Sequence, residues 1–255
     1  MNYRAKAVYV FLASVLLAPS TSFAQLPDCS AVGMPSYGQL TSALQAVVTG
    51  SNGGFGFPMW ATVVNRKGEV CAVTRSSANG EEWPGSRVIS AQKANTANAF
   101  SLPNFALSTA NLYTAVQPGH SLFGLQESNP VNPAVAYAGN ANNYGASNDA
   151  MVGQKIGGVN VFGGGLALYN GSGLLIGAIG VSGDSSCADH VIAWKVRDAL
   201  NLDHVPAGVN SDASRPDNII YDIEQHGGTQ DSASGWGHPH CLPTDVAPST
   251  LPTAP

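Results

Sequence analysis

The spacing of hydrophobic and polar residues predicts a helix followed by a hairpin near the start of the chain. In SYGQLTSALQAVVTG (36–50) the apolar side chains recur at helical spacing. The segments FPMWATVVN (57–65) and EVCAVTRS (69–76) are typical of strands, and a tight turn at Lys67-Gly68 separates them. We therefore expect an antiparallel pair of strands directly after the first helix.

A second helix and a long irregular segment follow this hairpin. SRVISAQKANTANAF (86–100) has helical spacing, and we expect Ser86 to be its N-cap. From about residue 101 to 151 the periodicity weakens and prolines interrupt the chain. Because an irregular stretch of this length is unusual inside one domain, we expect it to be either functional or a family-specific decoration.

Regular patterns return in the second half as another predicted hairpin. GVNVFGGGLALY (158–169) and LLIGAIGVSG (174–183) are apolar strings on either side of Asn170-Gly171, a strong hairpin signal. The many glycines do not predict a phosphate loop, because the spacing differs from both common patterns and no Lys-Ser/Thr pair follows. Glycine inside a strand more often indicates a close backbone approach.

The last predicted helix is SCADHVIAWKVRDAL (186–200), after which the chain is loop-like. The spacing of Ser186 and Asp189 suits a capping box at its start. The final segment LPTDVAPSTLPTAP (242–255) is typical of a disordered end. The predicted fold class is α+β, with one domain over 25–205 and an extended C-terminal tail over 206–255.

The N-terminus predicts export from the cytoplasm. Residues 1–24 combine a short basic region, an apolar stretch too short to span a membrane, and the small-residue ending Ser22-Phe23-Ala24. We expect a signal peptide that is removed after Ala24, and a mature protein that is periplasmic or secreted without a membrane span.

Charge and cysteine content narrow the possible partners. Removal of residues 1–24 leaves nine basic against 16 acidic residues, and no Lys/Arg cluster occurs, which argues against nucleic-acid binding. An even number of cysteines in an exported protein favours disulfides, and four allow three pairings. We favour Cys29–Cys71 and Cys187–Cys241, because each would tie a terminal segment to the core.

Three segments resemble the GlcG/HbpS family of haem-binding and haem-degrading proteins. They are FGGGLALYNGSGLLIGAIGVSGDSSCADHVIAW (162–194), WATVVNRKGEVCAVTR (60–75) and the helix 86–100. Within that helix the residues on family positions are Lys93, Ala94, Thr96, Ala97 and Phe100. The long insert, the tail and Asn65, which stands where an acidic residue is common, depart from the family pattern.

The resemblance implies a compact antiparallel sheet flanked by helices, a profilin-like sandwich that often forms homo-oligomers. It also implies binding of haem or a related tetrapyrrole, and in some relatives haem degradation or iron release. Two alternatives stay open: a haem-degrading or redox enzyme, and a non-catalytic structural or oligomerisation module. No close carboxylate pair or Ser/His/Asp set indicates catalysis directly.

Haem binding requires an axial donor to iron and cations near the propionates. The candidate donors are His190 in the first turn of the third helix and His120 in the insert, with Thr96 as a weaker oxygen donor. The candidate cations are Arg87 and Lys93. Each of these side chains also has a purely structural interpretation.

Two other groups of histidines and cysteines have a metal-like spacing. Cys187 and His190 offer only two donors, and an oxidised Cys187 would not bind metal, so no metal site is predicted there. The segment GWGHPHC (235–241) is expected to pack its Trp and Cys against the core.

Overall fold

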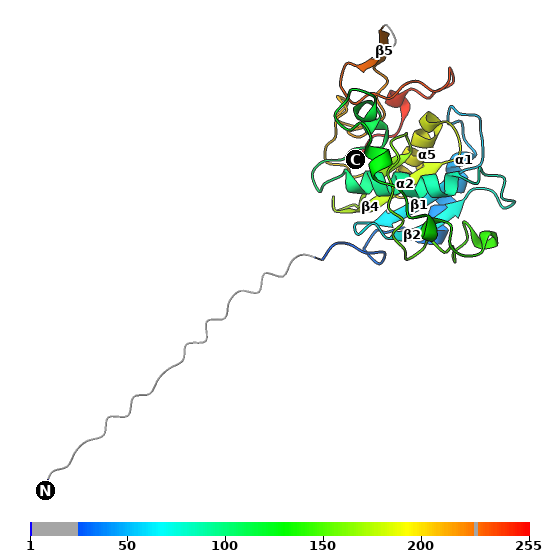
Figure 1. The fold of residues 1–255 in the computed structure, drawn as a ribbon, viewed down its shortest axis with the longest axis vertical. Helices are drawn as coiled ribbons and strands as arrows, with labels where there is room; N and C mark the ends of the chain where they lie inside the picture. Colours follow the sequence, from blue (N-terminus) through cyan, green and yellow to red (C-terminus); the bar gives the residue numbers. More distant parts are fainter. Residues whose placement is uncertain (2–24, 227–228) are drawn as a thin grey trace.

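The computed structural model describes Met1, residues 25–226 and residues 229–255 (Figure 1). The predicted signal peptide, apart from Met1, lies outside the described residues. Within the described part, no helix is both long and apolar enough to cross a membrane.

A four-stranded antiparallel sheet forms the centre of the molecule, in the order β2-β1-β4-β3. The strands are β1 (Trp60–Asn65), β2 (Val70–Arg75), β3 (Gly165–Tyr169) and β4 (Leu175–Ser182). The two predicted hairpins are confirmed as β1–β2 and β3–β4. The pairing of β1 with β4 joins segments more than 100 residues apart, so both halves of the sequence belong to one sheet.

Three helices cover the two faces of the sheet, as Figure 1 shows. Helix α2 (Ser86–Ala99) packs on β1, β3 and β4, and its alanines form one core with the residues on that face. Helices α1 (Tyr37–Val48) and α5 (Ser186–Ala199) pack on the opposite face and on each other. The predicted α+β class, an antiparallel sheet flanked by helices, is confirmed.

The glycines in β3 and β4 allow α2 to lie directly against the sheet. A methyl group on Gly180 would collide with the backbone oxygen of Ser90 in α2, and one on Gly165 would collide with that of Lys93. The close approach brings polar side chains of α2 to the strand ends. The glycine-rich run therefore serves helix–sheet packing.

The N-caps of two helices differ from the sequence prediction by one residue. Ser86 is the first residue of α2 and not its cap, because Gly85 occupies the cap position without a side-chain hydrogen bond. At α5 the cap is Ser185, whose hydroxyl accepts the Ala188 amide, so the predicted Ser186–Asp189 capping box is wrong. Asp189 instead accepts backbone amides from the loop before the helix.

The insert is mostly irregular, as predicted, but well packed. It contains only short helical turns: η1 (Ala110–Leu112), η2 (Thr114–Val116), α3 (Leu125–Ser128), α4 (Pro133–Ala136) and η3 (Ala141–Asn143). Buried side chains such as Leu112 and Met151 anchor it to the domain.

The tail is part of the folded body, and the predicted disordered end is wrong. It forms a hairpin, β5 (Ile223–His226) with β6 (Thr229–Ser232), and a short turn, η4 (Pro248–Thr250). Leu251 is buried in the core between sheet, α1 and α5. The polar, proline-rich composition of this segment did not indicate that one of its few apolar side chains would pack in the core. The boundary between domain and tail stays a prediction.

Candidate functional site

Arg87, a candidate cation, forms a buried ion pair that fixes the insert. Its Nε donates to Asp149 Oδ2 at 2.8 Å, and its Nη1 donates to the carbonyl oxygen of Ala136 at 2.7 Å. The guanidinium also lies 3.6 Å from the centre of the Tyr144 ring. With 1% of the residue exposed, Arg87 holds the insert against α2 and is not available to a ligand.

Lys93, six residues further along α2, reaches the end of β4 and the start of α5. Its Nζ lies 2.6 Å from Asp189 Oδ2 and donates to the carbonyl oxygen of Val181 at 3.2 Å. Burial raises the pKa of Asp189 to about 6, and the nearby ammonium opposes this rise. The pair therefore joins helices from the two faces of the sheet.

Thr96 is also fully buried and engaged. Its hydroxyl donates to the carbonyl oxygen of Gln92 at 2.8 Å and accepts the amide of Asn160 at 3.0 Å. The structural interpretation therefore accounts for all three candidates on α2.

His190, the first candidate donor, is completely buried in α5. Its Nε2 lies 3.1 Å from Asn218 Oδ1 in the tail, while its Nδ1 has no hydrogen-bond partner. Burial lowers the pKa of His190 to about 3, so the ring is neutral at pH 7. The tail covers the imidazole and separates it from solvent.

His120, the second candidate donor, lies at the surface in a turn of the insert. Its neighbour Phe123 is 66% exposed, while Leu122 packs against a buried cluster of the insert. Of the five candidate haem residues, His120 alone is exposed. The fold does not bring the five together as one site.

Both predicted disulfides are confirmed. Cys29 and Cys71 are bonded with their Cα atoms 5.3 Å apart, and Cys187 and Cys241 with theirs 5.9 Å apart. The first bond ties the N-terminal segment to β2. The second ties the first turn of α5 to the tail.

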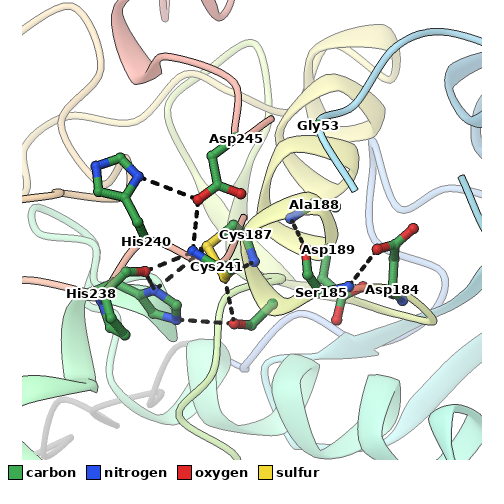
Figure 2. Close-up of a disulfide and its surroundings, with 12 residues drawn as sticks. Gly53, Asp184, Ser185, Cys187, Ala188, Asp189, His238, His240, Cys241 and Asp245 are labelled. Atoms are coloured by element: carbon green, nitrogen blue, oxygen red, sulfur yellow. Dashed lines mark hydrogen bonds and ion pairs between the residues drawn. A yellow bond between two sulfur atoms is a disulfide. The ribbon is translucent and has the colours of Figure 1, made fainter. Parts of the chain in front are cut away.

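The Cys187–Cys241 disulfide lies in a buried polar cluster (Figure 2). His238, 1% exposed, places its Nδ1 3.9 Å from Cys187 Sγ and 2.7 Å from the carbonyl oxygen of Pro239. Burial lowers the pKa of His238 to about 4. The expected packing of GWGHPHC against the core is confirmed for its Cys and Trp. No local pattern predicts that His238 lies against the sulfurs.

Two unsatisfied polar atoms lie in the same region of the tail. Asp245 accepts the Cys241 amide with Oδ2 at 2.7 Å, while its buried Oδ1 has no hydrogen-bond partner. The hydroxyl of Tyr221 is likewise buried and unpartnered, and burial together with Asp245 raises the pKa of Tyr221. Unsatisfied buried groups of this kind call for an explanation.

The buried candidates do not fit a haem site as they stand. Arg87 and Lys93 are neutralised by carboxylates, and His190 lies beneath the tail. The Thr96 hydroxyl already donates one hydrogen bond and accepts another. The hollow beside the 50–57 loop, of about 270 Å³, and two larger hollows of about 480 and 510 Å³ are lined by none of these four residues. Among the described candidates, only His120 combines an available imidazole with exposed apolar surface.

The fold defines a three-layered α+β domain, in which helices cover both faces of a 2-1-4-3 antiparallel sheet. The sequence matches the family of haem-degrading HbpS-like proteins over residues 38–197, and the chain belongs to this family. The resemblance seen in the sequence is thereby confirmed.

Several solved structures are similar to this chain. A Klebsiella pneumoniae protein, ORFY, is 26% identical, with 64% of this chain and 86% of that chain covered and a TM-score of 0.44. A PduOC–haem complex is 26% identical, covering 65% and 91%, with a TM-score of 0.45. HbpS is 20% identical, covering 65% and 89%, with a TM-score of 0.42. No protein with curated annotation matches the chain significantly.

Proposed function

We propose that this protein is exported and binds haem or a related tetrapyrrole. The observation that carries the proposal is the family match from α1 to α5, over residues 38–197. The family is described as haem-degrading, so its members must accommodate haem. The PduOC–haem complex among the similar structures agrees with this proposal.

Within this chain, His120 is the residue that we assign as the donor to iron. A neutral imidazole is a common axial ligand of haem iron, and His120 is exposed beside Phe123, whose ring can cover part of a porphyrin face. His190 could serve only after the tail had left α5, which would expose the buried contacts of Asn218 and Leu251.

Titration of the purified protein with haem tests this proposal. Binding through His120 should give a saturable, shifted Soret band, and His120→Ala should weaken the affinity at least tenfold. His204→Ala, which changes another histidine outside the core, is the matched control and should bind as wild type. The absence of a shift at micromolar wild-type protein would reject haem binding, whereas an unchanged His120→Ala titration would reject only the donor.

The family description also favours a second function, oxidative degradation of bound haem. Peroxide added to the haem-loaded protein should then abolish the Soret band and release iron that a chelator detects. A Soret band that is no less stable than that of haem bound to serum albumin would limit the protein to binding.

Export and self-association belong to the same proposal. Mass spectrometry of the protein recovered from a secreting host should show an N-terminus at Gln25, and retention of residues 1–24 would contradict export. Sedimentation of the mature protein should show a homo-oligomer, as the family resemblance implies.

A further inference from the structure

The region around the second disulfide gathers three metal-ligating side chains from distant parts of the chain. Cys187 lies in the first turn of α5, whereas His238 and Cys241 come from the tail (Figure 2). One ligand atom from each of the three lies within 4.8 Å of the other two. The spacing is short enough for one ion to touch all three after small side-chain rotations, once the sulfurs are separate thiolates.

The start of α5 provides an electrostatic environment that favours thiolates. Cys187 is in the first turn of this 14-residue helix, and its backbone amide donates to Cys241 Sγ at 3.2 Å. Cysteine thiolates at helix N-termini are stabilised by the helix dipole and by free amides. Both sulfurs therefore lie where their anionic forms, which bind metals, are stabilised.

His238 is oriented as metal-binding histidines usually are. Its Nδ1 donates to the carbonyl oxygen of Pro239 at 2.7 Å, which leaves the lone pair on Nε2. Nε2 lies 3.3 Å from Ser186 Oγ, and the same hydroxyl lies 3.4 Å from Cys241 Sγ. The imidazole Nε2 and this sulfur therefore both contact the Ser186 hydroxyl.

Asp245 gives an independent indication of a bound cation. Its side chain is 3% exposed; Oδ2 accepts the Cys241 amide, while Oδ1 is buried without a hydrogen-bond partner. A buried carboxylate oxygen without a donor is costly, and a nearby cation would offset the cost. A hollow of about 480 Å³, lined by His240, Cys241, Leu242, Pro243 and Asp245, leads from the surface to this place.

We infer that reduction of Cys187–Cys241 creates a binding site for a thiophilic divalent cation of the zinc class. A dithiol supplies two electrons and two protons, so that the S–S bond breaks, two thiols form and the dithiol becomes a cyclic disulfide. The cation then binds both sulfurs and His238, and the two thiol protons are released to solvent. The disulfide thus keeps the site closed, and this mechanism is independent of haem binding.

Anaerobic titration with Co²⁺ tests the inference, after dithiothreitol treatment and removal of the reductant. Cys29→Ser/Cys71→Ser retains only the second cysteine pair. In its reduced form it should bind one Co²⁺ per chain, with thiolate-to-cobalt charge-transfer bands and the visible bands of tetrahedral Co²⁺. The oxidised protein and reduced Cys187→Ser/Cys241→Ser should show neither set of bands.

Single substitutions locate the other ligand. His238→Ala should weaken Co²⁺ binding at least tenfold and alter the visible bands, whereas the matched His204→Ala, which contacts Asn201 away from this cluster, should leave both unchanged. Bands that persist in Cys187→Ser/Cys241→Ser, or equal effects of the two histidine variants, would overturn the inference.

A second measurement covers the possibility that reduction unfolds the protein. Because a ligand that binds only the folded state stabilises it, Zn²⁺ should raise the Tm of the reduced protein and leave that of the oxidised protein unchanged. A reduced protein that is unfolded by circular dichroism and stays unfolded with Zn²⁺ would also refute the site.

Discussion

The two disulfides are chemically identical bonds that lie in different surroundings. Cys29 is exposed and Cys71 half-buried, and the nearby polar contacts are an Asn65 amide 3.5 Å from Cys29 Sγ and a loose pair between Asp28 and Lys67 at 4.0 Å. Cys187, in contrast, is buried at the start of a helix, against His238 and a tail that continues into the core.

The comparison shows that the side chains around a disulfide, and not the bond itself, decide whether its sulfurs can do more than crosslink the chain. The loops that they close span 42 and 54 residues, so chain entropy predicts nearly equal stabilisation, about 4 kcal/mol each. Any larger difference must come from what each sulfur contacts. The Cys29–Cys71 bond fastens a surface segment, whereas the Cys187–Cys241 bond is the centre of a buried polar cluster.

Removal of each bond gives the largest expected effect. Cys29→Ala/Cys71→Ala should lower the free energy of unfolding by about 4 kcal/mol. Cys187→Ala/Cys241→Ala should lose about 1–2 kcal/mol more, because it also leaves a cavity at a buried position. Urea denaturation of the two variants under identical conditions provides the measurement. Equal losses would show that the buried surroundings contribute nothing to stability.

The ion pair between Arg197 and Asp217 tests whether the tail near Cys241 is held by more than its disulfide. Both side chains are fully buried, with Nη1 and Oδ2 2.6 Å apart. Asp217→Ala should therefore cost about 3–5 kcal/mol, because Arg197 is left charged and unpaired. Asp212→Ala, whose side chain is 40% exposed in its pair with Arg215, serves as the control and should change stability less in the same assay. If the two variants lost similar amounts of stability, the buried ion pair would not help to hold the tail on the domain.

Low pH should lower the free energy of unfolding by a smaller amount, and it should act on the region around Cys187–Cys241 rather than on the region around Cys29–Cys71. The pKa of His190 is about 3 in the folded protein and 6.5 when unfolded, so its contribution is complete above pH 6.5 and is lost as the pH falls towards 3. Between pH 7 and 4.5 the loss should be about 3 kcal/mol.

Urea titrations at the two pH values measure this loss. His190→Gln should reduce the pH dependence and leave the part that buried His238 contributes, while His204→Gln should not change it. Amide exchange at pH 4.5 should accelerate in α5 and the tail before it accelerates in β2. If the β2 end opened first, the buried imidazole would not be the acid-sensitive group.

The sequence predicted the parts of this protein that depend on local periodicity. The helices and both hairpins lie close to their predicted positions, because apolar spacing and turn residues act over a few neighbouring positions. Two N-caps were displaced by one residue, since several adjacent serines and glycines could fill the role and tertiary contacts chose among them. The cysteine pairing followed from the positions of the terminal segments.

The candidate site was decided by tertiary structure. Asp149 and Asp189, which neutralise Arg87 and Lys93, are 62 and 96 residues away from them, and no local pattern announces either partner. The same is true of His238, which the fold brings to Cys187 across 51 residues. Local sequence therefore fixed which elements form, whereas the charges and sulfurs acquired their partners only when long-range packing removed them from water.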